Sequence, residues 1–348
     1  VGASWPWVWA IVAAVAVTAS GLAYLRGRSD WGRARGLPPG SLSLVDSLDA
    51  ITHRGFYAAQ ARRHGPVFKM AQFHRPVVCI TDLALGLEVL NEQSDRMIQP
   101  RLPFGRLSPG NYIEFMNDER HARYRAILKT ALSGRLVGEC REGVSSLVRE
   151  RLHDLSEARG DQGAPPGPFL DRLAFATMLR VMFGVAVDDE RFPEIESWFG
   201  DLGTVRAFTE RRPEDRVEPF GRLVDWARSA GRSLIDSADG EVPSVLQEIL
   251  KADPGHLADD TVLGNLILIV HVTHSNIRGL LGWVLKEHVD HPHYGGRLRE
   301  LTSGPEGRFN AEVAATRFVN EVLRRNQSEY FYREVVRPLE IGDWTVPR

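Results

Sequence analysis

Residues 258–291 read ADDTVLGNLILIVHVTHSNIRGLLGWVLKEHVDH, and this stretch predicts one long helix. Asp259 and Asp260 stand at its start, where negative charge favours a helix N-terminus. Pro292 follows its end, where proline cannot continue the helix. At about 1.5 Å per residue the helix would be roughly 50 Å long, enough to cross a whole domain. We therefore treat it as the element around which the chain is organised.

The first half of this helix is apolar on nearly every face, which predicts that it is buried. Its apolar side chains are Val262, Leu263, Leu266, Ile267, Leu268, Ile269 and Val270. The middle is polar, with His271, Thr273, His274, Ser275 and Asn276. Buried polar side chains need hydrogen-bond partners, which either neighbouring helices or a buried cofactor would supply. The stretch by itself leaves both interpretations open.

The composition is that of an ordinary globular protein, since 43% of the 348 residues are hydrophobic and 25% are charged. This length allows one large core or two domains. The net charge of -2 gives no sign of a nucleic-acid surface, so we expect no nucleic acid as a partner. Cys79 and Cys140 are the only cysteines, which argues against a disulfide framework and for a reducing compartment.

The N-terminal stretch has the pattern of a membrane anchor. Residues 1–25 carry no charge and come close to the roughly 20 residues that span a bilayer. Trp5, Trp7 and Trp9 at one end and Tyr24 at the other are typical of residues at a membrane interface. We therefore predict an N-terminal transmembrane anchor over residues 1–25.

Residues 26–40 are predicted to form a basic and proline-rich hinge. Arg26, Arg28, Arg33 and Arg35 precede a Leu-Pro-Pro-Gly run at 37–40. By the positive-inside rule these arginines place everything after residue 26 in the cytoplasm. A cleaved signal peptide is the alternative, because residues 19–21 are small, but no basic residue precedes the apolar run.

Beyond the hinge the pattern predicts a mainly α fold with a small β-sheet region. Two apolar runs at 67–71 and 77–80 predict a hairpin, and Asp82 is a good N-cap for a helix that would bury Leu83, Leu87 and Leu90. A long loop at 97–113 precedes an unusually basic helix at 117–132. Apolar spacing then predicts helices at about 136–158, 169–184, 190–209, 214–238, 243–251, 258–291 and 311–326.

Glu321 and Arg324 lie three residues apart on the last predicted helix, so their side chains can pair. Such a pair alone indicates little, because many surface helices carry one. Its position indicates more: an extended aromatic segment, Arg333 and a predicted strand pair follow it.

The order of these features resembles the cytochrome P-450 family over nearly the whole chain. The sequences that carry the resemblance are the anchor followed by Leu-Pro-Pro-Gly at 37–40, Gly-Pro-Val at 65–67, Glu-Arg-His-Ala-Arg-Tyr-Arg at 119–125 with its His-x-x-x-Arg element, Phe-Gly at 183–184, the long helix ending in His-Pro at 291–292, and Glu-Val-Leu-Arg at 321–324. The resemblance implies a cytochrome P-450-like catalytic domain over residues 41–348. It also implies heme b as the cofactor.

The resemblance assigns roles to several residues. His121, Arg125 and Arg333 would donate charge-assisted hydrogen bonds to the two heme propionates. Glu321 and Arg324 would form a buried structural ion pair that supports the core facing the heme.

The centre of the long helix departs from the family pattern. Thr273 stands where the family usually has Gly, Ser275 where it has an acid, and Asn276 where it has Thr. In the family the acid and the Thr are catalytic and help to protonate the distal oxygen, but Asn is a poor proton relay. Asn at this position is similar to the subgroup of prostacyclin synthase and the sterol hydroxylases of bile-acid synthesis. Both oxygenase and isomerase or dehydratase chemistry therefore stay open.

The axial ligand of the iron in this family is a Cys in a Gly-rich loop after the final strands, and this sequence reaches Arg348 before any such loop. Cys79 and Cys140 lack the Phe and Gly residues that flank the ligand. The resemblance therefore implies a fragment that is incomplete at its C-terminus, has no metal ligand of its own and is inactive alone.

The function that the resemblance implies is a membrane-anchored monooxygenase, with a cytoplasmic catalytic domain, that inserts oxygen into a small lipophilic substrate. Its electrons would come from a reductase or a ferredoxin. Substrate would contact residues 98–113, about 198–212, 270–276 and 327–332. One alternative is an isomerase or dehydratase that acts on a peroxide and needs no reductase. Another is a truncated, non-catalytic helical protein that binds lipids or partners.

Overall fold

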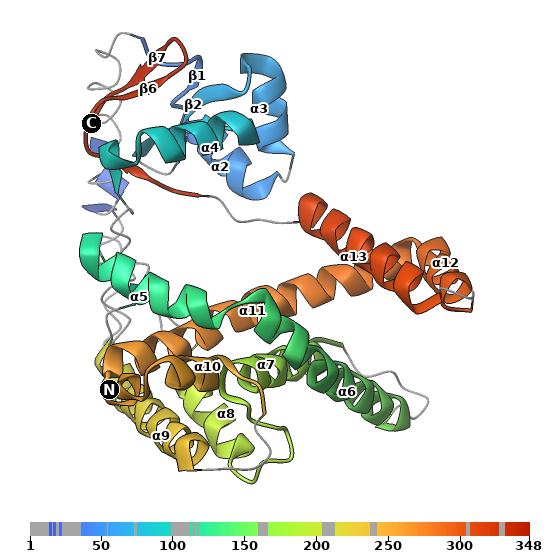
Figure 1. Cartoon of the computed structure of the whole chain (residues 1–348). Helices are drawn as coiled ribbons and strands as arrows, with labels where there is room; N and C mark the ends of the chain where they lie inside the picture. Colours follow the sequence, from blue (N-terminus) through green and yellow to red (C-terminus); the bar gives the residue numbers. More distant parts are fainter. Residues whose placement is uncertain are drawn as a thin grey trace, which may run out of the picture. The chain divides into compact units, whose positions relative to one another are not determined.

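The computed structural model divides into two compact units, residues 1–100 with 331–348 and residues 101–330 (Figure 1). The residues described are 14–15, 17–18, 21–22, 36–53, 55–72, 75–98, 112–113, 116, 118–158, 166–203, 213–236, 242–303, 307–326 and 331–348.

The first unit contains three small sheets. Its strands are β1 (Gly40–Ser41), β2 (Val67–Gln72), β3 (Arg75–Ile80), β4 (Met97–Ile98), β5 (Glu334–Val335), β6 (Leu339–Ile341) and β7 (Trp344–Val346). β1 runs parallel to β2, and β2 pairs with β3 as the predicted antiparallel hairpin. β4 pairs with β5, and β6 with β7. Gly40 pairs with Lys69, and a Cβ there would lie 2.0 Å from the Lys69 carbonyl oxygen, so only glycine fits where the hinge meets the sheet.

Three helices accompany these sheets: α2 (Leu44–Thr52), α3 (Phe56–His64) and α4 (Leu83–Glu92). α2 and α3, which the sequence pattern did not predict, pack on β2 around Phe56, Phe68 and Met70. Asp82 caps α4 as predicted, because its Oδ1 accepts a hydrogen bond from the Leu85 N–H at 2.9 Å.

The predicted buried face of α4 is wrong. Leu83 is 77% exposed and Leu87 is also exposed, whereas Val89 is buried and packs with Val67 and Ile80. The helix carries apolar residues on several sides, so spacing alone could not select the one that meets the sheet.

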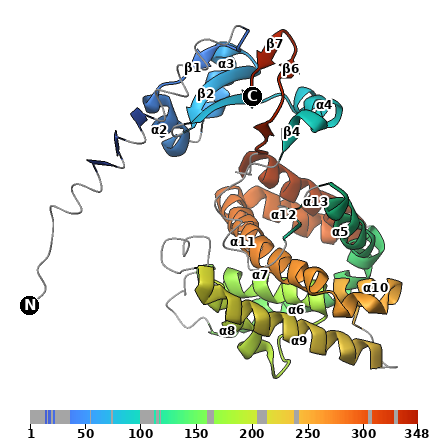
Figure 2. The same cartoon turned by 90° about the vertical axis from the view of Figure 1, so that its left-hand side faces the viewer.

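The second unit is a helical bundle. Its helices are α5 (Asp118–Ala131), α6 (Gly134–Ala158), α7 (Pro166–Phe183), α8 (Phe192–Asp201), η5 (Pro213–Arg216), α9 (Val217–Asp236), α10 (Val245–Ala252), η6 (Pro254–Ala258), α11 (Asp260–Asp290), α12 (Pro292–Thr302) and α13 (Gly307–Asn326). α11 packs against α7, α9, α12 and α13 (Figure 2). The prediction of a mainly α protein with a small β-sheet region is therefore confirmed.

α11 is the predicted long helix. The Asp259 carboxylate accepts a hydrogen bond from the Thr261 N–H at 2.9 Å and caps its start. Its first half is buried as expected, including Leu263, Leu266 and Ile267. α12 was not predicted, because Pro292 was taken only as an end signal, yet proline also suits the first turn of a new helix.

Among the described residues, no helix is both long and apolar enough to cross a membrane. Most of the predicted anchor at 1–25 lies outside the described residues, as does most of the hinge. The predicted extension of α8 to residue 209 also falls largely outside them.

Candidate functional site

The polar centre of α11 is less buried than the sequence suggested. Ser275 and Asn276 are exposed, and the Ser275 hydroxyl donates to the Val272 carbonyl of the same helix at 3.0 Å. Thr273 is half-buried. The two predicted catalytic residues therefore stand side by side on an open face of α11.

One buried polar residue of α11 is Asn265, which is 1% exposed and which the sequence pattern did not single out. Its Oδ1 accepts from the Ile113 N–H at 2.7 Å, and its Nδ2 donates to the Thr261 carbonyl at 2.7 Å. The sequence signal for this residue is a single Asn within an apolar run, which indicates a buried side chain that needs hydrogen-bond partners. Asn265 thus ties residue 113 of the predicted substrate-lining stretch to α11.

His274 links α11 to α7. Its Nε2 lies 3.0 Å from the Asp171 carbonyl oxygen and 3.4 Å from Asp171 Oδ1, and Arg278 Nη1 lies 3.3 Å from the same Oδ1. The Phe175 and His274 rings pack at 71° to each other, with their centroids 5.6 Å apart. This histidine is therefore a packing residue with partners, in keeping with the first of the two interpretations.

His271 differs from His274. Burial, with the charges of Arg216 and His274, lowers the pKa of His271 to about 4. The imidazole is therefore neutral near pH 7, and it lies within residues 270–276, a stretch predicted to contact substrate.

The basic helix α5 packs against α10, and it reaches Asp259, the N-cap residue of α11. The Tyr124 hydroxyl donates to Asp259 Oδ2 at 3.0 Å, and Arg123 Nη2 lies 4.0 Å from the same oxygen. His121 and Arg125 lie four residues apart on a neighbouring face, half-buried and exposed respectively. Neither has a hydrogen-bond or ion-pair partner among the described residues. Two cationic or donor groups on one face are thus available to an anion.

Glu321 and Arg324 form the ion pair that the spacing predicted, with Nη2–Oε1 and Nε–Oε2 distances of 2.6 and 2.7 Å. The hydrogen bond from Arg324 lowers the pKa of Glu321. The prediction that the pair is buried is wrong, because Glu321 is 51% and Arg324 70% exposed. Val322 is the residue of this turn that faces the interior, so the side chains of Glu321 and Arg324 face solvent.

Arg333 belongs to the first unit, whereas His121 and Arg125 belong to the second. It is exposed, and its Nη1 donates to the Tyr332 carbonyl at 2.8 Å.

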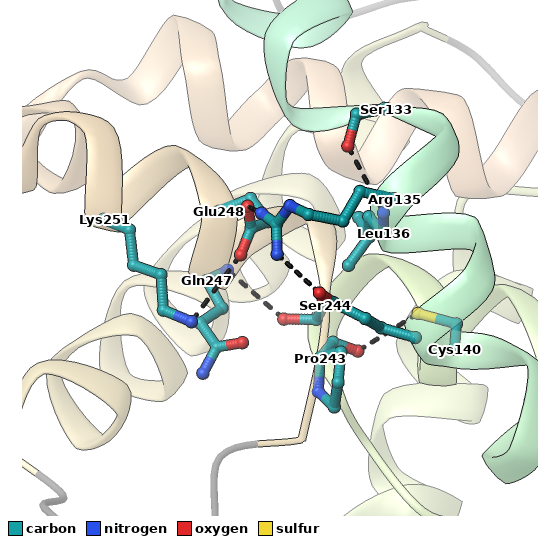
Figure 3. Close-up of polar contacts among 10 residues, drawn as sticks. Ser133, Arg135, Leu136, Cys140, Pro243, Ser244, Gln247, Glu248 and Lys251 are labelled. Atoms are coloured by element: carbon teal, nitrogen blue, oxygen red, sulfur yellow. Dashed lines mark hydrogen bonds and ion pairs between the residues drawn. The ribbon is translucent and has the colours of Figure 1, made fainter.

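The two cysteines do not fit the role of a metal ligand. Burial raises the pKa of Cys79, in β3, to about 12, and burial also raises the pKa of Cys140. The Cys140 thiol donates to the Pro243 carbonyl at 3.3 Å (Figure 3). Each shift disfavours the thiolate, which is the form that a metal binds. The described ranges also contain no group of three or more His, Cys, Asp or Glu side chains that could hold a metal ion.

The contacts around Cys140 join α6 to α10 and are structural. Arg135 pairs with Glu248, Lys251 lies 3.6 Å from the same carboxylate, and Ser244 Oγ accepts from the Gln247 N–H at 3.2 Å (Figure 3). These contacts hold the start of α6 against the start of α10, and we assign them no chemical role.

A helical bundle crossed by one long helix, a basic helix with a His-x-x-x-Arg element and a Glu-x-x-Arg pair define a class of heme enzyme. The family model of cytochrome P450 matches residues 40–248, which is more than half of the chain. The chain therefore belongs to the cytochrome P450 family. Members of this family bind heme b and are oxidoreductases of the monooxygenase type.

Known proteins of this family resemble the chain over most of its length. "Putative cytochrome P450 138" of Mycobacterium tuberculosis is 23% identical over 86% of this chain and 70% of its own length. Abscisic acid 8'-hydroxylase 2 of Arabidopsis thaliana is 20% identical over 90% of this chain and 70% of its own length. The structure of retinoic acid bound cyanobacterial CYP120A1 superposes with a TM-score of 0.65 at 18% identity, and it covers 90% of this chain and 75% of that chain.

The described residues include donors for the heme propionates, but no cysteine suited to bind the iron. His121 and Arg125 fit the anionic edge of heme, because both are free of partners among the described residues and lie on one face. Neither cysteine fits the iron. We therefore derive no step of catalysis through the iron from these 348 residues.

Proposed function

We propose that the chain is the body of a heme monooxygenase that oxidises a small lipophilic molecule with O2 and electrons from a reductase or ferredoxin. The observation that carries this proposal is the family match over residues 40–248, which includes the helix with His121 and Arg125. Abscisic acid and retinoic acid, which the names of two similar proteins contain, are small lipophilic molecules and support this substrate class. Heme, when bound, supplies the activation of oxygen.

His121 and Arg125 would hold the heme propionates, and Arg333 would be a third donor to them. The free donors on α5 support the first two assignments. Glu321 and Arg324 would keep α13 in shape as a structural ion pair.

Ser275 and Asn276 would face the substrate and oxygen. The Asn side chain both donates and accepts hydrogen bonds, so it would orient a water molecule or a substrate oxygen rather than relay a proton. Residues 98–113, 198–212, 270–276 and 327–332 would line the substrate. Most of the first, second and fourth stretches lie outside the described residues.

The domain boundaries of the proposal are an anchor at 1–25, a hinge at 26–40 and a catalytic domain at 41–348. The uncharged first 25 residues and the arginines that follow support a membrane anchor with the catalytic domain in the cytoplasm.

The test is the carbon-monoxide difference spectrum of the reduced protein, expressed from its full coding sequence. A Soret band at the long wavelength of thiolate-ligated heme is the expected result. His121→Ala and Arg125→Ala should each lower heme occupancy about tenfold, since each removes a charge-assisted hydrogen bond. Arg232→Ala, at an exposed position of α9, is the matched control and should leave occupancy unchanged. No heme uptake by the unaltered protein would overturn the proposal.

Asn276 supports a second candidate, an isomerase or dehydratase that acts on a peroxide. Substrate loss that depends on NAD(P)H and a reductase would exclude it. Turnover of a peroxide without any electron donor would favour it. If heme binds but neither reaction occurs, a non-catalytic lipid-binding or partner-binding protein is the remaining candidate.

A further inference from the structure

The end of α11 carries a buried acid that the proposed chemistry does not use. Glu287 is 8% exposed, which makes it the least exposed residue of α11 after Val270. A carboxylate in such a place is costly unless other groups satisfy its oxygens. The identity of those groups indicates what Glu287 holds in place.

The partners of Glu287 come mainly from the last turn of α13. Asn326 Nδ2 donates to Glu287 Oε1 at 3.1 Å in a buried hydrogen bond. Arg325 Nη1 lies 3.6 Å from Oε2, and His291 Nε2 lies 3.5 Å from the same oxygen. One carboxylate thus joins the C-terminal end of α11 to the C-terminal end of α13, 39 residues later in the chain.

The helices on either side of this carboxylate are packed closely. A Cβ at Gly295 of α12 would lie 2.4 Å from His288 Cε1, so the His288 ring of α11 fills the space beside Gly295. The Tyr294 ring lies 5.5 Å from the Phe318 ring of α13. Side-chain packing thus holds α12 against both α11 and α13. The last turn of α13 is held to α11 by the polar contacts of Glu287.

We propose that Glu287 is a positioning residue that fixes the last turn of α13 against α11. The inference rests on the proposed function, which assigns the centre of α11, with Ser275 and Asn276, to the substrate. Asn276 lies 11 residues before Glu287, or about 16 Å along the helix, so the same rigid element carries both. Glu287 would therefore act on substrate placement through the packing of α11 on α13, without touching the substrate.

Four variants of the full chain test this role. Glu287→Ala removes every polar contact of the side chain. Glu287→Gln keeps its size and a hydrogen bond to Asn326 but loses the charge that attracts Arg325 and His291. Asn326→Asp places two carboxylates against each other. The double variant E287Q/N326D moves the carboxylate across the same hydrogen bond, so an amide can again donate to it beside Arg325.

The first readout is amide hydrogen exchange in residues 321–326. Exchange there should rise about tenfold in all three single variants. The buried hydrogen bond is removed in E287A, loses its charged acceptor in E287Q and is opposed by a second carboxylate in N326D. Exchange should return to within about twofold of the unaltered chain in E287Q/N326D. Glu300→Gln, at an exposed ion pair of α12, is the control and should leave this exchange unchanged.

The second readout is catalytic. In the heme-loaded enzyme E287Q should raise KM or change the ratio of products while its heme spectrum stays unaltered, and E287Q/N326D should restore both. A lack of rescue in the double variant, or unchanged exchange in both E287Q and N326D, would overturn the proposal. If E287A does not fold, the other three variants still decide. If no heme binds, the proposed function fails, and the exchange readout still decides whether Glu287 fixes α13.

Discussion

His271 couples the stability of the protein to pH. Burial lowers its pKa from 6.5 to about 4, so below pH 6.5 the unfolded chain binds a proton that the folded chain does not. The contribution of the neutral imidazole is thus fully present above pH 6.5 and is lost as the pH falls toward 4, by up to about 3 kcal/mol. His271→Gln should flatten the dependence of the unfolding free energy on pH in this window, measured by urea denaturation. His153→Gln, at an exposed position of α6, should keep the slope of the unaltered chain; equal slopes for all three proteins would contradict the prediction.

Individual residues also show which properties could be predicted from the sequence and which could not. The spacing of Glu321 and Arg324 was enough to predict their pairing, because three residues along a helix fix which side chains meet. Their exposure could not be predicted, since it depends on which face of α13 meets other helices. Asn265 was missed for the same reason: only the fold brings residue 113 to its amide.

At the scale of elements, α5 and α11 are joined by the bond from Tyr124 to the cap residue Asp259. Tyr124→Phe keeps the buried ring and removes the hydroxyl that donates to the carboxylate at 3.0 Å. We expect a loss of about 1 to 2 kcal/mol in the free energy of unfolding, as for a hydrogen bond to a charged group. Tyr294→Phe is the control, because the Tyr294 hydroxyl has no hydrogen-bond partner among the described residues. Equal losses of unfolding free energy in the two variants would show that the hydrogen bond from Tyr124 to Asp259 does not stabilise the protein.

The long helices were predictable because each repeats an apolar pattern over several turns. α11 is the clearest case, with both its N-cap and its final proline readable from sequence. The short helices α2 and α3 were not, because two or three turns carry too little period to stand out from a loop. α12 was hidden by the proline that starts it.

At the scale of the whole molecule, each unit contains one cysteine that can report its unfolding. Cys79 lies in the first unit and Cys140 in the second, and burial raises the pKa of both thiols. Because the thiolate is the reactive form, iodoacetamide at pH 8 should leave both unmodified in the native protein. In a urea series each should become modified when its own unit opens, as measured by mass spectrometry of the two peptides. Rapid labelling of either cysteine without urea would contradict this burial.

The membrane anchor is the last property of the whole chain that the sequence predicts. Residues 1–25 are uncharged and four arginines follow them within ten residues, so transfer of the segment into a bilayer should bring those arginines to its surface. The full chain should therefore float with lipid vesicles in a density gradient and stay with them in alkaline carbonate, which releases proteins held only by charge. A chain that starts at Gly36 removes both the apolar segment and the arginines, and it should stay in the aqueous fraction. A chain that starts at Arg26 separates the two contributions, because it keeps the arginines and loses the apolar residues. If this chain still floats with the vesicles but is released by carbonate, membrane binding depends on charge. Residues 1–25 would then have no anchoring role.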